Sequence, residues 1–173
     1  MATLAPDTAR TAFVAGLRDA HAVENQALAL IDRQLDRLEN YPEVADMLRT
    51  HRGETEAQIG RLEEILTSLD ESHSGLKDLG LSISGNLAAL AHTVAPDEVI
   101  KNSFANHAFE HFEIAAYTGL LALADGGGFG KATPLLEQSL GEEQRMAQLV
   151  LDSIPRITAK YVELRAAGEQ AGR

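Results

Sequence analysis

Apolar residues recur along most of this chain at alternating steps of three and four, the spacing that places them on one face of an α-helix. The clearest run comprises positions 17, 21, 24, 28, 31, 35 and 38, which form one heptad seam. No stretch of the sequence shows the strict apolar–polar alternation that a half-buried β-strand needs. The pattern therefore predicts an all-α protein.

Helix-breaking and turn-forming residues separate the periodic segments, and the segments between them predict four long helices and one weaker helix. The long helices cover about residues 7–39, 42–69, 96–126 and 131–154, and the weaker helix covers about 76–92. Asp7 and Thr8 are typical N-cap residues, and Pro42 suits a first helical turn. Pro155 marks a kink or a break, after which a short helical piece to about Ala167 leads into a fraying tail.

The lengths of the connections predict how these helices are joined. The first two long helices are separated by only a few residues, as are the last two, so each pair is expected to form an antiparallel hairpin. Two hairpins linked by one long crossover is the connectivity of a ferritin-like four-helix bundle, here with one extra helix in the crossover. We expect residues 1–173 to form one such domain, with a core at about 8–155 and a C-terminal helical extension and tail at 156–173.

Each long predicted helix carries at least one carboxylate on or beside the face that should be apolar. These residues are, in chain order, Glu24, Glu54, Glu110, Glu113 and Glu143, and His51 precedes Glu54 by three residues. Within each hairpin, the two carboxylate positions differ in height by three or four residues, or about 5 Å along a helix. The acidic side chains are therefore expected to meet near the middle of one bundle.

Carboxylates gathered in a dry interior need positive charge or protons. An unpaired ionised carboxylate costs several kcal/mol there, and no Lys or Arg is expected on these seams. Carboxylate and imidazole form a ligand set for iron, manganese or zinc. In a dinuclear bundle, Glu24 and Glu143 would be the single ligands, while His51 with Glu54 and Glu110 with Glu113 would be the paired ligands.

Several polar residues near this cluster have more than one interpretation. His21 and His107 are either hydrogen-bonded core histidines or ligands, and Gln58 is either a partner of the carboxylates or a plain polar seam residue. Tyr117 either donates a hydrogen bond to a carboxylate or only packs. Glu142 is most simply a surface residue, although its position on the helix is ambiguous.

The net charge and the amino-acid composition exclude several classes of function for this chain. The formal net charge of −11 argues against nucleic acid and against an anionic membrane surface as partners. The absence of cysteine excludes disulfides, iron–sulfur clusters and thiol catalysis, so a redox function would need an external electron donor. We find no membrane-spanning run and no signal peptide, and we therefore expect a cytoplasmic protein.

Three segments resemble motifs of the YciE/YciF family of stress-associated, ferritin-like bacterial proteins. The AExQ-type motif corresponds to Val23–Gln26, and the HxxETxxQI-type motif corresponds to His51–Ile59. The most specific match is to the VEHYEIAAY-type motif, at Phe109–Tyr117, and an LxEE run corresponds to Leu140–Glu143. The resemblance covers most of the chain, from about residue 17 to residue 151.

This resemblance implies a ferritin-like domain with a di-iron carboxylate centre, usually dimeric and linked to stress responses. The family pattern falls on Glu24, Glu54, Glu110, Glu113 and either Glu142 or Glu143, with His51 as a nitrogen ligand. Our first hypothesis is therefore a dinuclear site, with two iron ions per chain, of oxidase, peroxidase or ferroxidase type. The alternative is a non-enzymatic dimeric adaptor or stress protein with a vestigial or structural cation site.

Overall fold

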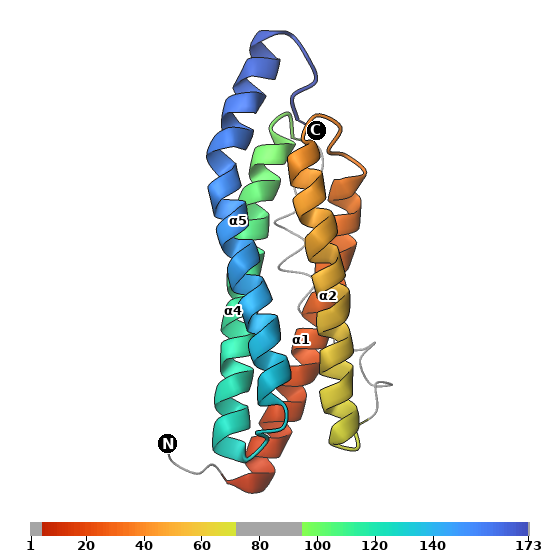
Figure 1. Ribbon diagram of the computed structural model, residues 1–173, viewed down its shortest axis with the longest axis vertical. Coiled ribbons are helices and arrows are strands. Elements are labelled where there is room, and N and C mark those ends of the chain that lie inside the picture. The colour runs from red at the N-terminus through yellow and green to blue at the C-terminus, as the bar shows by residue number, and fades with distance from the viewer. Residues whose placement is uncertain (1–4, 72–94, 173) are drawn as a thin grey trace.

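The computed structural model describes residues 5–71 and 95–172, and within those ranges it contains helices and no β-strand. The helices are α1 (Pro6–Leu35), α2 (Pro42–Ser68), α4 (Glu98–Gly127) and α5 (Thr133–Ala166). They lie side by side along one long axis (Figure 1). The predictions of an all-α protein and of four long helices are confirmed, whereas the weaker helix predicted at residues 76–92 lies outside the described residues.

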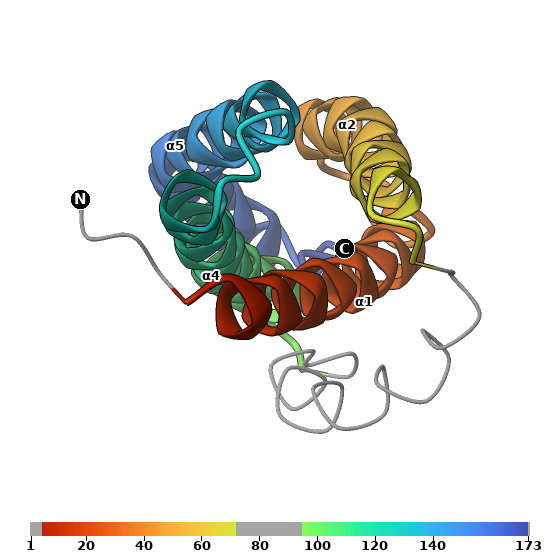
Figure 2. The same ribbon diagram turned by 90° about the horizontal axis from the view of Figure 1, so that it is seen from below.

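The four helices form a ring in which each packs against two neighbours. Helix α1 contacts α2 and α4, and α5 contacts α4 and α2. Figure 2 shows this ring end-on, and Figure 1 shows that neighbouring helices run in opposite directions. The end of α2 and the start of α4 lie at opposite ends of the bundle (Figure 1). The predicted pair of antiparallel hairpins is therefore present.

The first helix is shorter at its C-terminus than the periodicity predicts. It ends at Leu35 rather than at Glu39, because the N–H groups of Arg37 and Tyr41 bond carbonyls only three residues earlier and tighten the chain into turns. Its N-cap is Ala5, not Asp7 or Thr8, because Pro6 takes the first helical position, for which its fixed φ angle is suited.

The last helix continues through Pro155 without a break. Proline removes one backbone donor, which leaves the carbonyl of Leu151 without its helical partner. Leu151 is 45% exposed and Pro155 is also exposed, so water can take the place of the missing N–H group. The separate C-terminal piece that the sequence predicts is therefore the final part of α5.

The residues after α5 form an ordered tail, which corrects the prediction of a fraying end. Gly168 has a φ angle of +76°, a left-handed conformation that lets the chain turn back along the bundle. The hydroxyl of Tyr41 then donates to the carbonyl of Ala171 at 2.7 Å, and the N–H of Val99 donates to Gly172 at 3.1 Å. These bonds fix the tail against the α1–α2 turn and the start of α4.

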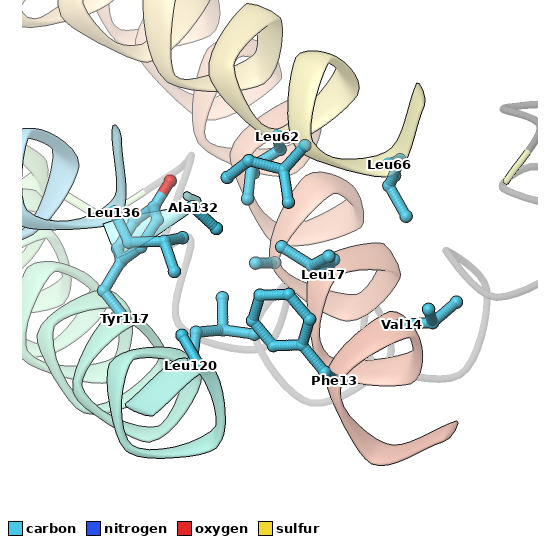
Figure 3. Packing of buried hydrophobic residues seen from close by; sticks show 12 residues of the cluster. Phe13, Val14, Leu17, Leu62, Leu66, Tyr117, Leu120, Ala132 and Leu136 are labelled. Carbon is cyan, nitrogen blue, oxygen red and sulfur yellow. The ribbon is translucent and has the colours of Figure 1, made fainter. Parts of the chain in front are cut away.

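Two apolar clusters fill the two ends of the bundle. One contains Phe13, Leu17, Leu62, Leu66, Tyr117, Leu120 and Leu136 (Figure 3), and the other contains Ile31, Tyr41, Leu48, Val99, Met146 and Val150. On every helix, buried polar side chains lie between the residues of one cluster and those of the other, and on α1 and α4 they are accompanied by a small third cluster of Val23, Ala27 and Phe109. The core is thus interrupted by a polar layer, and that layer holds the predicted carboxylates.

Candidate metal centre

All four helices contribute a buried polar side chain to the layer between the apolar clusters. The side chains are Glu24 from α1, His51 from α2, Glu110 and Glu113 from α4, and Glu143 from α5. None is more than 5% exposed, and Glu143 is completely buried. Five of the six predicted ligands therefore lie inside the bundle, on the helix faces that the seams predict.

His51 lies between carboxylates of α4 and α5. Its Nε2 atom is 3.3 Å from Oε2 of Glu110 and 3.8 Å from Oε2 of Glu143. One ligand atom from each of these three residues lies within 4.8 Å of the other two. Burial lowers the pKa of His51, but the hydrogen bonds and charges of Glu110 and Glu54 outweigh that effect and raise the pKa overall. The group has the donor types and the spacing of a metal site.

Several oxygens of this layer receive no hydrogen bond from the part of the chain that the structure describes. They are both carboxylate oxygens of Glu113, Oε2 of Glu24 and Oε2 of Glu143. A buried polar atom without a partner costs about 1–3 kcal/mol, and more when it is charged. Such clustered unpartnered oxygens indicate that a cation or protons complete the site.

Three carboxyl groups of this layer, those of Glu24, Glu113 and Glu143, have raised pKa values. Burial raises the pKa of Glu24 from 4.5 to about 7, although the hydrogen bond from Tyr117 acts in the opposite direction. Burial raises the pKa of Glu113 well above 4.5, and the neighbouring carboxylates Glu24, Glu143 and Glu110 raise it further. The pKa of Glu143 also rises, first through burial and then through Glu110. Without a cation, the layer therefore retains protons at neutral pH.

Two neutral side chains orient the carboxylates. The hydroxyl of Tyr117 donates to Oε1 of Glu24 at 2.5 Å, and Nε2 of Gln58 donates to Oε1 of Glu143. Each bond occupies one oxygen and leaves the second oxygen free to face the layer. Of the interpretations left open above, Tyr117 is thus a hydrogen-bond donor and Gln58 is a partner of a carboxylate.

Glu54 lies at the edge of the layer instead of within it. Its side chain is 29% exposed, and its Oε2 atom lies 3.2 Å from Nδ1 of His51. The other oxygen, Oε1, lies 3.3 Å from Nη2 of Arg145 on α5. In this conformation Glu54 supports the imidazole ring and does not join the buried carboxylates.

The interior contains an arginine that the sequence analysis missed. Arg61 of α2 is 8% exposed and donates through both terminal nitrogens to the carboxylate of Glu142. Arg61 lies beside the predicted seam of α2, one residue before Leu62, so a positive charge is buried in the bundle although no seam position carries one. Both carboxylate oxygens of Glu142 accept hydrogen bonds, from Arg61 and Gln138. Oε2 of Glu143 accepts none, so Glu143 is the residue with an oxygen available in the layer.

The two additional histidines have hydrogen-bond partners other than the buried carboxylates of the layer. Nε2 of His21 is 3.1 Å from Glu63, which is partly exposed, and Nδ1 of His107 is 3.1 Å from the carbonyl of Ala147. Both rings therefore have hydrogen-bond partners outside the layer. The described helices include none that is long and apolar enough to cross a membrane.

Comparison with known proteins places the chain in a family. The model of a domain of unknown function (DUF892) matches residues 8–163. Protein YciF of Escherichia coli K12 is 28% identical over 144 residues, which cover 79% of this chain and 84% of YciF.

Solved structures share the arrangement of helices. A protein from Xanthomonas campestris pv. campestris matches with a TM-score of 0.76 and 27% identity, over 91% of this chain and 99% of that one. The E. coli stress protein YciF matches with a TM-score of 0.65 and 23% identity, over 84% and 94% of the two chains. These findings confirm the resemblance carried by the sequence motifs, and the chain belongs to the DUF892 family.

Proposed function

We propose that this chain is a ferritin-like dinuclear carboxylate protein that binds two iron ions in the polar layer of its bundle. The ligands would be Glu24, His51, Glu54, Glu110, Glu113 and Glu143, and the same ligand types also suit manganese or zinc. Bound iron would supply electron transfer with dioxygen or peroxide, in an oxidase, peroxidase or ferroxidase type of reaction. We also propose that the protein acts as a homodimer and receives electrons from an external donor.

One observation carries this proposal: the buried carboxylate oxygens have no partner among the described residues. Glu24, Glu113 and Glu143 come from three helices, and each turns at least one such oxygen into the layer. Arg61, which is buried nearby, donates its hydrogen bonds to Glu142 and gives none to these oxygens. Divalent or trivalent cations would satisfy these oxygens and remove the repulsion between the carboxylates.

Residues around the layer would orient these ligands and keep water away from them. Tyr117 and Gln58 fix the rotamers of Glu24 and Glu143, so the free oxygens already face the interior. The two apolar clusters exclude water from both ends of the layer, which strengthens the interaction of each carboxylate with a cation. Glu54 would reach the site by exchanging Arg145 for a metal ion.

Metal analysis of protein purified from iron-supplemented cells tests the proposal. We expect about two iron ions per chain and a near-UV absorption that disappears on chelation. The variant Glu110→Gln keeps the shape of the side chain but removes its charge, and it should lose at least half of the metal. Glu137→Gln on α5 is the matched control, because Glu137 is exposed. Metal contents that are equal in Glu110→Gln and in the wild type would contradict the proposed ligand set.

A second candidate function is a non-enzymatic helical adaptor with a structural cation or none. The observation in its favour is the raised pKa of Glu24, Glu113 and Glu143, which lets these groups stay protonated without a metal. A colourless protein whose melting temperature is unchanged by chelation would favour this adaptor over the dinuclear site.

A further inference from the structure

The polar layer is closed at both ends, so a cation must reach it from the side of the bundle. The two apolar clusters fill those ends. Of the six proposed ligands, Glu54 is the one with a substantially exposed side chain, at 29%, whereas the other five residues are at most 5% exposed. Water therefore reaches the ligand set at Glu54, on the side where α2 packs beside α5.

A cavity of about 300 Å³ lies between α2 and α5 at this point. Exposed residues, among them Thr50 and Leu149, line its outer part, and the buried His51 lines its inner part together with Glu54. A second cavity of about 300 Å³, between α1 and α4, is lined by none of the proposed ligands. Since one water molecule occupies about 30 Å³ of liquid, the α2–α5 cavity has room for a divalent cation with several water ligands.

His51 connects the inner wall of the cavity with the carboxylates of the layer. Its Nδ1 atom lies 3.2 Å from Oε2 of Glu54. On the other side of the ring, Nε2 lies 3.3 Å from Oε2 of Glu110 and 3.8 Å from Oε2 of Glu143. Ligand atoms of α2, α4 and α5 thus follow one another from the cavity to the interior, so a cation that leaves Glu54 has its next ligands within reach.

Arg145 occupies the carboxylate that an entering cation would meet first. Its Nη2 atom lies 3.3 Å from Oε1 of Glu54, and its side chain is 62% exposed. An ion pair this exposed contributes little to stability and opens readily. Besides His51, the charged residues of the wall are Glu43, Glu54, Arg145 and Arg156, so their formal charges cancel. When Arg145 turns into solvent, these groups are left with a net negative charge, as the whole chain has, and this favours a cation.

We propose that divalent cations enter the polar layer through the α2–α5 cavity, and that Arg145 controls this entry by occupying Glu54. Glu54 is the first ligand on the route and His51 is the second. Arg145 is a positioning residue, because it acts only through Glu54. This inference rests on the proposed function, since it requires that the layer binds cations, and it adds the route by which they arrive and the residue that sets their rate of entry.

Uptake of Co²⁺ by metal-free, full-length protein tests the route, because Co²⁺ bound to carboxylate and imidazole ligands absorbs visible light. Stopped-flow absorption gives the rate of uptake, and excess chelator gives the rate of release. Thr50→Trp places an indole ring at the mouth of the cavity. It should slow uptake and release alike, at least fivefold, because a barrier on the route hinders both directions, while the affinity and the amount of bound Co²⁺ stay within about twofold of the wild type.

Thr118→Trp is the matched control for the blocked cavity. Thr118 is an exposed threonine of α4, and its hydroxyl donates to the carbonyl four residues earlier, as the hydroxyl of Thr50 does. Thr118 does not line the α2–α5 cavity. This variant should therefore change neither the uptake nor the release of Co²⁺.

A second pair of variants tests the role of Arg145. Arg145→Gln should speed Co²⁺ uptake about two- to fivefold, because Glu54 is no longer occupied by a guanidinium. Arg33→Gln removes the same charge from an exposed position on α1 and should leave the rate of uptake unchanged. The comparison separates the contact with Glu54 from the general attraction of a more negative protein for cations.

Equal rates of uptake and release in Thr50→Trp and the wild type would overturn the route, and equal uptake in Arg145→Gln and Arg33→Gln would overturn the role of Arg145. Circular dichroism of each variant shows whether it is folded. If the wild type binds no Co²⁺, the proposed function fails and this inference fails with it. If it binds Co²⁺ at rates that none of the four variants changes, this inference fails alone.

Discussion

Replacing Glu113 by glutamine should stabilise the metal-free protein and prevent it from retaining metal. Glu113 is 2% exposed, and neither of its oxygens receives a hydrogen bond from the described residues. Its neighbours in the layer are carboxylates, which raise its pKa further above the value that burial produces. Glutamine has nearly the same shape, carries no charge and offers an amide N–H to Glu24 or Glu143.

The size of the effect follows from proton linkage. A carboxyl whose pKa is raised on folding contributes its full stability below its ordinary pKa of 4.5, and this contribution is lost as the pH rises. Each pH unit costs about 1.4 kcal/mol while the folded protein keeps the proton, so the upper limit at pH 8 is about 5 kcal/mol. Sharing of protons among the coupled carboxyls reduces this to about 2–4 kcal/mol, or about 5–15 °C in melting temperature.

Thermal unfolding followed by circular dichroism, with excess chelator at pH 5 and pH 8, measures this effect. At pH 8 the variant should melt above the wild type, and at pH 5 the two should agree to within about 1 kcal/mol. The wild type itself should lose stability between about pH 4.5 and 7, the window set by Glu24. Glu137→Gln, on the exposed face of α5, should change nothing at either pH.

Either of two results would contradict the prediction for Glu113→Gln. If the variant is less stable than the wild type in chelator at pH 8, the layer is not a site of carboxylate repulsion. If it retains as much metal as the wild type, Glu113 is not a ligand.

Three further substitutions test other parts of the account. Arg61→Met should destabilise the protein by about 3–5 kcal/mol in urea unfolding, because it leaves Glu142 buried without its partner. Tyr117→Phe should weaken metal retention in a chelator competition, since it frees the rotamer of Glu24, and it should raise the pKa of that carboxyl in a ¹³C-NMR titration. Truncation after Gly168 should lower the free energy of unfolding by about 1–3 kcal/mol, through loss of the buried hydrogen bonds of the tail.

The helices and their buried faces could be predicted because both depend on the spacing of apolar and polar residues that are close together in the sequence. Steps of three and four place Glu24 on the same face as Leu17 and Ile31, and these apolar residues belong to the two clusters that enclose the layer. The short hairpin turns then set the heights of the carboxylates. For this reason, the sequence suffices to predict that acidic side chains of α1, α4 and α5 approach one another beside His51 of α2.

Side-chain partners that depend on packing could not be predicted in the same way. Arg61 lies one residue off the seam defined by Gln58 and Leu62, and its long side chain reaches Glu142 only because α2 packs beside α5. Glu54 is also one residue off the seam, and its contact with Arg145 depends on the same packing of α2 against α5. Arginines at such flanking positions are the one sequence signal that could have indicated these pairs.

The tail was missed for a related reason. Residues 168–172 have no apolar periodicity. Their backbone carbonyls accept hydrogen bonds from the side chains of Asn40 and Tyr41 and from the N–H of Val99, which lie far away in sequence. Only the glycine at position 168, which permits the left-handed turn, hinted that the chain reverses there.

Anomalous scattering from crystals of iron-loaded protein, recorded on both sides of the iron absorption edge, would locate iron in the bundle directly. We expect two anomalous peaks inside the bundle, each bound by carboxylates of the group Glu24, Glu110, Glu113 and Glu143, with His51 bound to one of them. An interior without peaks, in crystals of protein shown to have been exposed to iron, would contradict this prediction, as would metal found only at surface carboxylates.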